Sequence, residues 1–158
     1  MQALHLAGTL AVEEAFPMDN SDKKFRKLYE TDIYNKDGLN GYAYVPNGIA
    51  VAVSNPRNET MPGTNPEQLL GLSLSTCMNA TLQAIEREND LDHTAEVHVH
   101  VTMVKGTDGL EFLVHAMVSI PSVSYERAVE LTNQAEQRCP VSKLLSGSIN
   151  YTVETLQN

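Results

Sequence analysis

Residues 65–89, NPEQLLGLSLSTCMNATLQAIEREN, are the most informative stretch of this chain for its fold. The segment opens with Asn65 as a capping side chain, Pro66 at the first helical position and an acid, Glu67, in the first turn, a combination typical of a helix start. The residues that follow are apolar or small on nearly every face. The polar run at 86–88 then indicates a solvated end. We therefore expect one long helix that ends near residue 89 and is buried on most of its sides.

Segments with the alternating pattern of β-strands precede and follow this helix in the sequence. The expected strands are residues 25–34, 41–45, 49–53, 95–104, 110–120 and 148–155. A Pro-Asn-Gly turn at 46–48 predicts that the second and third form a hairpin, and a Gly-Thr-Asp-Gly turn at 106–109 predicts a longer hairpin from the fourth and fifth. A second helix is expected over 125–138, with Ser122 or Ser124 as its cap. These elements predict one α+β unit.

Composition and charge exclude several classes of protein. The chain has 158 residues, of which 42% are apolar, and this is enough for one folded domain. We expect a single domain over residues 25–158 and an N-terminal helix or arm at 1–24. The apolar stretch at 3–12 is too short to span a bilayer and lacks the cationic start of a signal peptide, so the expected location is the cytoplasm. The net charge of −9 argues against nucleic acid and anionic membranes as partners.

The chain has two cysteines, Cys77 within the expected long helix and Cys139 directly before Pro140, where the second helix should break. Two cysteines are too few for a disulfide scaffold. They form no C-x-x-C motif, which excludes a zinc ribbon and a thioredoxin-type site. Taken singly, each is more often a small core residue than a reactive thiol. Their function therefore depends on the segments in which they stand.

Those two segments resemble the OsmC/Ohr family of peroxide-reducing proteins. Residues 63–77, GTNPEQLLGLSLSTC, are similar to its T-N-P-E-x-L helix start, with a reactive cysteine ten residues after the glutamate. Residues 138–154, RCPVSKLLSGSINYTVE, are similar to its C-P-x-S segment before the last strand, in a form that looks more like the OsmC branch. The resemblance covers roughly residues 25–156. It implies an OsmC-like α+β fold, with antiparallel sheets around a long buried central helix, in an intertwined homodimer with its sites at the subunit interface.

The resemblance implies a thiol-dependent peroxidase that reduces organic hydroperoxides. Cys77 would attack the peroxide and become a sulfenic acid, and Cys139 would condense with it to a disulfide. A separate dithiol, such as a lipoyl-bearing protein, would then reduce the disulfide, and neither a metal nor a cofactor is implied. Cys77 lies about three turns into its helix, beyond the reach of the helix dipole, so its thiolate needs a cation or a strong donor from elsewhere.

The role of Glu67 and the source of the cation need separate arguments. Ten helical residues rise about 15 Å, so Glu67 would act on the Cys77 of a partner subunit if it belongs to the site. Otherwise it is simply an acid favoured in a first helical turn. The resemblance implies an arginine in an early glycine-rich loop, but the matching residues 35–41 contain none. Lys36 in that loop and Arg57 before the helix are the candidate replacements, although lysine lacks the planar two-pronged donor of arginine.

Two further functions stay open from the sequence. The missing loop arginine favours a non-catalytic OsmC-like protein that binds a small apolar ligand or senses redox state through its thiols. His98 and His100 share one face of an expected strand, a pattern that would suit a metal-binding module. No third ligand is evident in the sequence, which favours a solvent-facing sheet surface instead.

Overall fold

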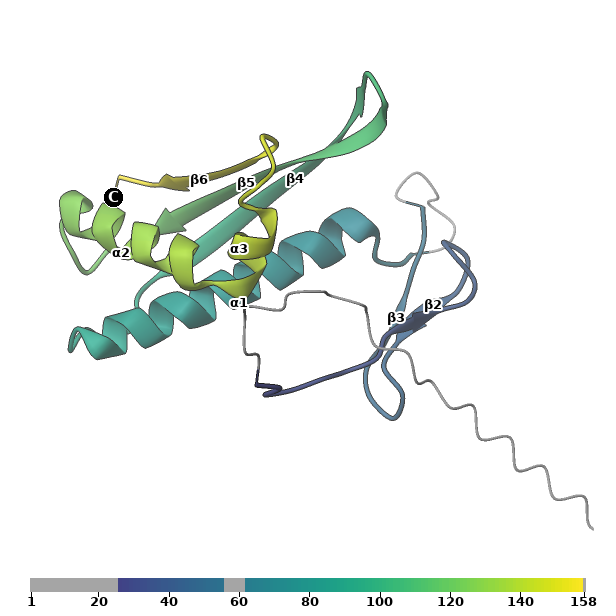
Figure 1. The fold of residues 1–158 in the computed structure, drawn as a ribbon, viewed down its shortest axis with the longest axis horizontal. Helices are drawn as coiled ribbons and strands as arrows, with labels where there is room; N and C mark the ends of the chain where they lie inside the picture. The colour runs from purple at the N-terminus through teal and green to yellow at the C-terminus, as the bar shows by residue number, and fades with distance from the viewer. Residues whose placement is uncertain (1–25, 56–61, 158) are drawn as a thin grey trace, which may run out of the picture. The chain divides into compact units, whose positions relative to one another are not determined.

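The computed structural model describes residues 26–55 and 62–157. The chain divides into two units, residues 1–31 and residues 32–158. Of the first unit, residues 26–31 are described; they are exposed and have no regular secondary structure. The expected N-terminal helix or arm at 1–24 lies outside the described residues. Every helix and strand reported below belongs to the second unit (Figure 1).

The described part of the second unit contains six strands and three helices. In chain order they are β1 (Tyr34–Asn35), β2 (Tyr42–Tyr44), β3 (Ala50–Ala52), α1 (Pro66–Glu88), β4 (Glu96–Gly106), β5 (Gly109–Ser119), α2 (Tyr125–Arg138), α3 (Pro140–Leu145) and β6 (Tyr151–Thr155). The strands form two three-stranded sheets, in the orders β1-β2-β3 and β4-β5-β6. The first is antiparallel, whereas in the second β6 runs parallel to β5. The fold is therefore α+β, and no helix of the described residues combines the length and apolar character needed to cross a membrane.

The first sheet is small and forms only partly as the sequence predicts. Strands β2 and β3 make the expected hairpin, and Asn47 adopts φ 58° in its turn. The expected strand over 25–34 is wrong for most of its length, because only Tyr34 enters a strand. Residues 26–33 are exposed, and a strand is stable only when a neighbour takes up its backbone hydrogen bonds. Within the described chain these residues have no such neighbour.

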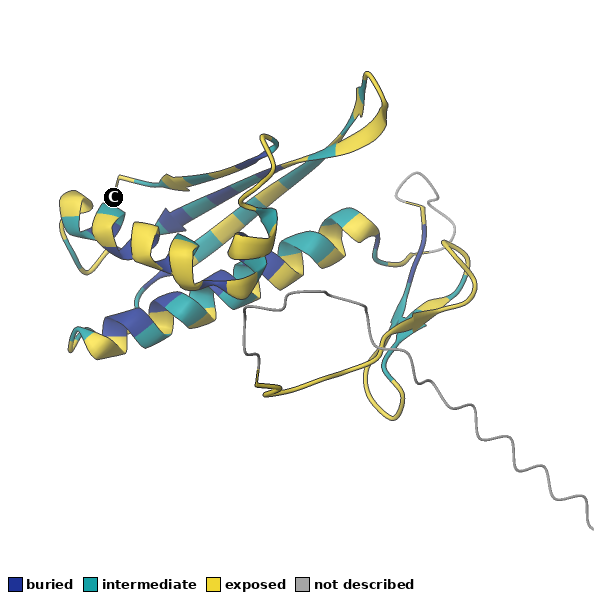
Figure 2. Ribbon diagram, in the orientation of Figure 1, coloured by how far each residue is buried: buried dark blue, intermediate teal, exposed yellow. Residues whose placement is uncertain are grey.

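Helix α1 forms where its sequence predicts. The side chain of Asn65 accepts a hydrogen bond of 2.9 Å from the backbone N–H of Gln68, and Asn89 ends the helix. Within this chain the helix buries only one face, shown in dark blue in Figure 2. The buried residues are Leu74, Met78, Leu82, Ile85 and Glu86. Leu72, on another face, is 61% exposed, so the expectation of burial on most sides is not met within a single chain.

The core is built from helices α1 and α2 and from one face of the sheet β4-β5-β6, and Figure 2 shows buried residues in all of these elements. Alternate residues of β5 contribute to it, namely Val114, Ala116 and Val118, because successive strand side chains point to opposite faces. The stripe of α2 that joins them consists of Ala128, Leu131 and Ala135. This packing brings the C-terminal end of α2 against α1, which positions the residues that follow α2.

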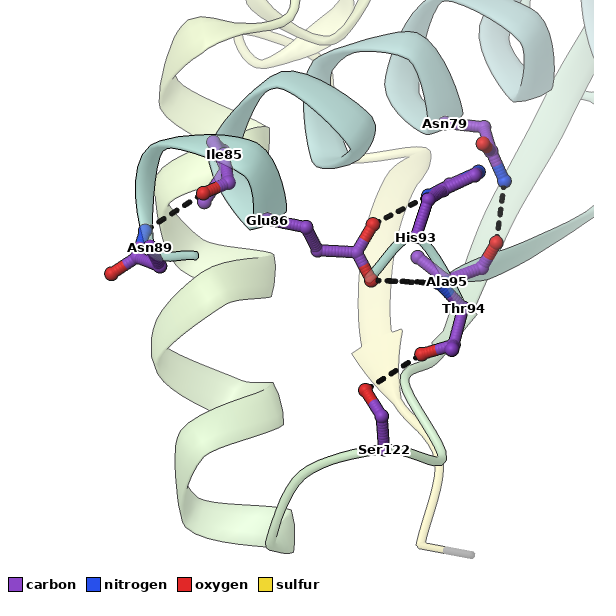
Figure 3. A network of polar contacts seen from close by, with 8 residues as sticks. All are labelled: Asn79, Ile85, Glu86, Asn89, His93, Thr94, Ala95 and Ser122. Carbon is purple, nitrogen blue, oxygen red and sulfur yellow. Dashed lines mark hydrogen bonds and ion pairs between the residues drawn. The ribbon is translucent and has the colours of Figure 1, made fainter. Parts of the chain in front are cut away.

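A buried carboxylate ties the end of α1 to the start of β4. Glu86 is fully buried, and its Oε1 accepts hydrogen bonds of 3.1 Å from the backbone N–H groups of Thr94 and Ala95 (Figure 3). Its Oε2 lies 2.5 Å from Nδ1 of His93. A buried carboxylate is costly unless it is paired and hydrogen-bonded, so these contacts hold the turn between the two elements. The expectation of a solvated helix end is wrong for Glu86.

Candidate active site

The two cysteines meet where α1 contacts α3. Cys77 is half-buried in the middle of α1, and Cys139 is fully buried between α2 and α3. The thiol of Cys139 donates to the Sγ of Cys77, and the two sulfur atoms lie 3.1 Å apart. Both thiols are free. A disulfide has a sulfur–sulfur distance near 2.05 Å, so a movement of roughly 1 Å would join them.

Cys139 is held in place by the break between α2 and α3. Pro140 has no backbone N–H and cannot continue α2, but its fixed φ suits the first position of a new helix. Cys139 is the N-cap of that helix, and its Sγ accepts the backbone N–H of Ser142 at 3.4 Å. The sequence predicts the break at Cys139-Pro140, whereas the short helix α3 after it is a finding of the structure.

The surroundings of Cys139 favour its protonated form. Burial raises the pKa of the Cys139 thiol, because the apolar core disfavours a thiolate. The hydrogen bond from the backbone N–H of Ser142 partly offsets this, and the contact with Cys77 raises the pKa further. Cys139 is therefore a thiol at neutral pH and has an S–H to donate. The arrangement places this S–H against the Sγ of Cys77.

A second buried pair lies behind Cys139. The Oγ of Ser142 and the phenolic oxygen of Tyr151 are 2.9 Å apart, and either can donate. Ser142 is fully buried and Tyr151 is 9% exposed. Burial raises the pKa of Tyr151, so its hydroxyl keeps its proton. The pair connects α3 to β6. Ser142 stands in the C-P-x-S segment, but the sequence pattern indicated no role for either residue.

Glu67 lies in the first turn of α1, ten residues before Cys77. It lines a groove of about 660 Å³ between residues 67–75 of α1 and the Val97–Val101 stretch of β4, and neither cysteine lines this groove. Among the described residues, the Oε2 of Glu67 is buried and has no hydrogen-bond partner. A buried carboxylate oxygen normally has a partner, so this position would accept a cation or another donor.

Of the two candidate cations, Lys36 and Arg57, the structure describes only Lys36. Lys36 is exposed in the turn between β1 and β2, where the Oδ1 of Asn35 accepts the backbone N–H of Gly38 at 2.7 Å. Arg57 lies outside the described residues. No lysine or arginine within 26–55 or 62–157 hydrogen-bonds to the sulfur of Cys77. The roles of Glu67, Lys36 and Arg57 therefore stay predictions.

Three histidines lie on the face of the second sheet that is opposite the core. His98 and His100 are both exposed, and His115 stands directly across from His100. His115 pairs with Glu154 of β6 at 3.0 Å. Even so, no three His, Cys, Asp or Glu side chains of the described residues could hold a metal ion together. The metal-binding alternative therefore has no ligand set in this part of the chain.

Comparison with known proteins supports the resemblance in sequence. The family model described as OsmC-like protein matches residues 57–154. This chain belongs to the OsmC family. Among solved structures, the OsmC-family fold seen here matches a candidate redox protein from Lactobacillus casei with a TM-score of 0.80 and 50% identity, over 84% of this chain and 94% of that one.

Curated proteins similar to this chain have names that refer to organic hydroperoxide resistance. The chain is 26% identical over 132 residues to the organic hydroperoxide resistance protein OhrB of Bacillus subtilis, which is 80% of this chain and 97% of the relative. It is 31% identical over 137 residues to the organic hydroperoxide resistance protein-like 1 of Staphylococcus epidermidis, which is 82% of this chain and 97% of the relative. The OsmC-like fold and the family's association with organic hydroperoxide resistance are thus confirmed.

Proposed function

We propose that this protein is a thiol-dependent peroxidase that reduces organic hydroperoxides to alcohols. The observation that carries the proposal is the 3.1 Å separation between the sulfur atoms of Cys77 and Cys139. An attacking and a resolving cysteine must come within bonding distance after the first is oxidised, and this pair needs little movement to do so. The names of the curated relatives support organic hydroperoxides as the substrate class.

Cys77 performs the first step. Its thiolate attacks the outer oxygen of the hydroperoxide, so that an S–O bond forms and the O–O bond breaks. The sulfur is oxidised by two electrons to a sulfenic acid. The alkoxide that leaves takes up a proton and departs as the alcohol. Until then the S–H of Cys139 stabilises the thiolate, because a hydrogen bond to the charged form favours it.

Cys139 performs the second step. Its thiol gives up a proton as its sulfur attacks the sulfur of Cys77, the S–S bond forms and the S–O bond breaks. The hydroxide released takes that proton and leaves as water. An external dithiol, of the lipoyl kind, then reduces the disulfide through two exchanges and becomes a disulfide itself. The cycle returns both cysteines to the thiol state.

We also propose an intertwined homodimer in which a second copy covers the groove between α1 and β4. Strand β4 has 11 residues and forms one edge of its sheet in the described chain, and a long open edge is a liability that proteins normally cover. The apolar Leu72 is 61% exposed beside it. Across such an interface Glu67 would orient Lys36 or Arg57 toward a thiolate, which would supply the cation that Cys77 lacks.

The test measures consumption of cumene hydroperoxide with dihydrolipoamide as the reductant. Cys77→Ser should abolish turnover, because the nucleophile is lost. When the dithiol is left out, Cys139→Ser should consume one equivalent and then stop, with the sulfenic acid trapped by dimedone. Ser73→Ala, an exposed change on the same helix, should turn over like the unmodified protein. Undiminished turnover by Cys77→Ser would overturn the proposal.

A non-catalytic protein that senses redox state or binds a small apolar ligand is the second candidate. It is favoured by the finding that no lysine or arginine of the described residues hydrogen-bonds to Cys77. The alkylation rate of Cys77 by iodoacetamide at pH 7 separates the two. A rate well above that of N-acetylcysteine indicates an activated thiolate and favours the peroxidase. A rate equal to it favours the non-catalytic protein.

A further inference from the structure

The buried pair of Ser142 and Tyr151 takes no direct part in the proposed chemistry, yet it adjoins the resolving cysteine. The backbone N–H of Ser142 donates to the Sγ of Cys139. The two hydroxyl oxygens are 2.9 Å apart and both residues are buried. Tyr151 begins β6, where it pairs in register with Val114 of the central strand β5. Its hydroxyl is therefore anchored to the sheet. Ser142 belongs to α3, which has only six residues.

Ser142 is the residue through which this anchor reaches Cys139. Its backbone N–H donates to the Sγ of Cys139 at 3.4 Å, while its side chain contacts Tyr151. The sulfur of Cys139 therefore accepts on one side and donates on the other, to the Sγ of Cys77 at 3.1 Å. A sulfur that receives the Ser142 N–H has its own proton free to point elsewhere. The Sγ of Cys77, at 3.1 Å, is the acceptor within its reach.

We propose that Ser142 and Tyr151 are positioning residues that hold the sulfur of Cys139 in reach of Cys77. A helix of six residues is not stable by itself, so the place of α3 depends on its contacts with the rest of the fold. Loss of the Tyr151 hydroxyl would leave the Oγ of Ser142 buried without its partner, and the first turn of α3 would shift to find another. Small displacements of a reacting group slow a reaction strongly. The role rests on the proposed peroxidase cycle, in which Cys139 attacks the oxidised Cys77.

The experiment measures how fast the disulfide closes after one equivalent of cumene hydroperoxide, by acid quenching and mass spectrometry. Tyr151→Phe keeps the ring and removes only the hydroxyl, and we expect closure to slow about tenfold. Ser142→Ala should slow it by a similar factor. The double variant should be no slower than the slower single variant, because both changes break the same contact. Formation of the sulfenic acid should change less than closure.

Matched controls remove hydroxyls that do not contact this pair. Tyr125→Phe removes the hydroxyl of an exposed tyrosine on α2, and Ser146→Ala removes an exposed hydroxyl at the end of α3. Both should close at the unmodified rate. The rate at which iodoacetamide alkylates Cys77 at pH 7 adds a second readout. The rate should fall in Tyr151→Phe, because the hydrogen bond from Cys139 to Cys77 is weakened, and should not change in the controls.

The same variants separate this inference from the proposed function. Diamide, an azo oxidant that accepts two electrons and two protons from a dithiol, closes the disulfide without peroxide. If the protein does not turn over hydroperoxide but Tyr151→Phe slows closure by diamide, the peroxidase proposal fails and the positioning role stands. If Tyr151→Phe lowers the unfolding midpoint but closes at the unmodified rate with both oxidants, the pair is only structural and the inference is overturned. Tyr151→Phe decides the matter alone if Ser142→Ala does not fold.

Discussion

The thiol of Cys139 donates a hydrogen bond to the Sγ of Cys77, and the two sulfur atoms lie 3.1 Å apart. The family resemblance implies a cation beside the Cys77 sulfur, whereas in this structure a buried S–H contacts it. The two residues are 62 positions apart in the chain. Burial raises the pKa of Cys139 and keeps this donor protonated. In the proposed cycle this contact would stabilise a thiolate at Cys77 and would place the resolving sulfur beside it.

Removing the Cys139 thiol should slow the reaction of Cys77 with iodoacetamide. In Cys139→Ala the donor is lost, and a net hydrogen bond of about 1 kcal/mol corresponds to a rate about fivefold lower at pH 7. Cys139→Ser keeps a hydroxyl donor and should react at a rate between those of Cys139→Ala and the unmodified protein. The rates are read by mass spectrometry of the alkylated peptide. An unchanged rate in Cys139→Ala would show that this donor does not activate Cys77.

The free energy of unfolding should fall in alkaline solution. Burial raises the pKa of Cys139 above its ordinary value of 9.0 and that of Tyr151 above 10.0. The unfolded chain therefore loses these protons at a lower pH than the folded protein does. The stabilising contribution is fully present below the ordinary values and is lost as the pH rises toward the raised ones. Urea unfolding from pH 7 to pH 11 under reducing conditions measures this decline, which should be shallower in Tyr151→Phe and in Cys139→Ser.

Neutralising Glu86 should destabilise the fold strongly. In Glu86→Gln an amide replaces the fully buried carboxylate that accepts from Thr94 and Ala95 and contacts His93, and breaking such a network costs about 3 kcal/mol. Urea unfolding at pH 7 and constant protein concentration measures the loss. Glu130→Gln, on the exposed face of α2, is the matched control and should change stability little. A loss in Glu86→Gln no larger than in this control would contradict the structural role of the network.

A charge in the groove should prevent dimerisation. In Leu72→Glu a carboxylate replaces an apolar side chain that lines the groove between α1 and β4. If a second copy covers this groove, the variant must bury that charge and should sediment as a monomer, whereas the unmodified chain sediments as a dimer. Leu144→Glu changes a leucine that is 83% exposed on α3 and should stay a dimer. Sedimentation velocity measures all three. A dimeric Leu72→Glu would place the interface elsewhere.

Several elements follow from short stretches of sequence. Asn65 and Pro66 predict the start of α1, because a capping side chain and a residue without an N–H both suit the first helical turn. The hairpins follow from their turn residues, and the end of α2 follows from Pro140. The expected strand at 25–34 failed because its stability needs a neighbouring strand, which no local pattern supplies.

Sequence motifs predicted the two cysteines of the candidate site but not the buried polar contacts of the fold. The sequence alone singled out Cys77 and Cys139 through the motifs around them, and the OsmC-family match covers both segments. It did not show that Glu86 is buried, because a carboxylate at the end of a helix is usually solvated. It also showed no link between Ser142 and Tyr151. Both contacts join elements that are separated along the chain.

Residues close together in the chain were therefore enough to predict the OsmC family, the main helices and hairpins, and the two cysteines of the candidate site. Tertiary packing was needed to bring the two sulfur atoms to 3.1 Å, with Cys139 as donor and Cys77 as acceptor, and to set a buried hydroxyl pair beside Cys139. The physical reason is that burial and hydrogen-bond direction depend on how α1, α3 and β6 pack together. That packing is a property of the whole fold and of no single segment.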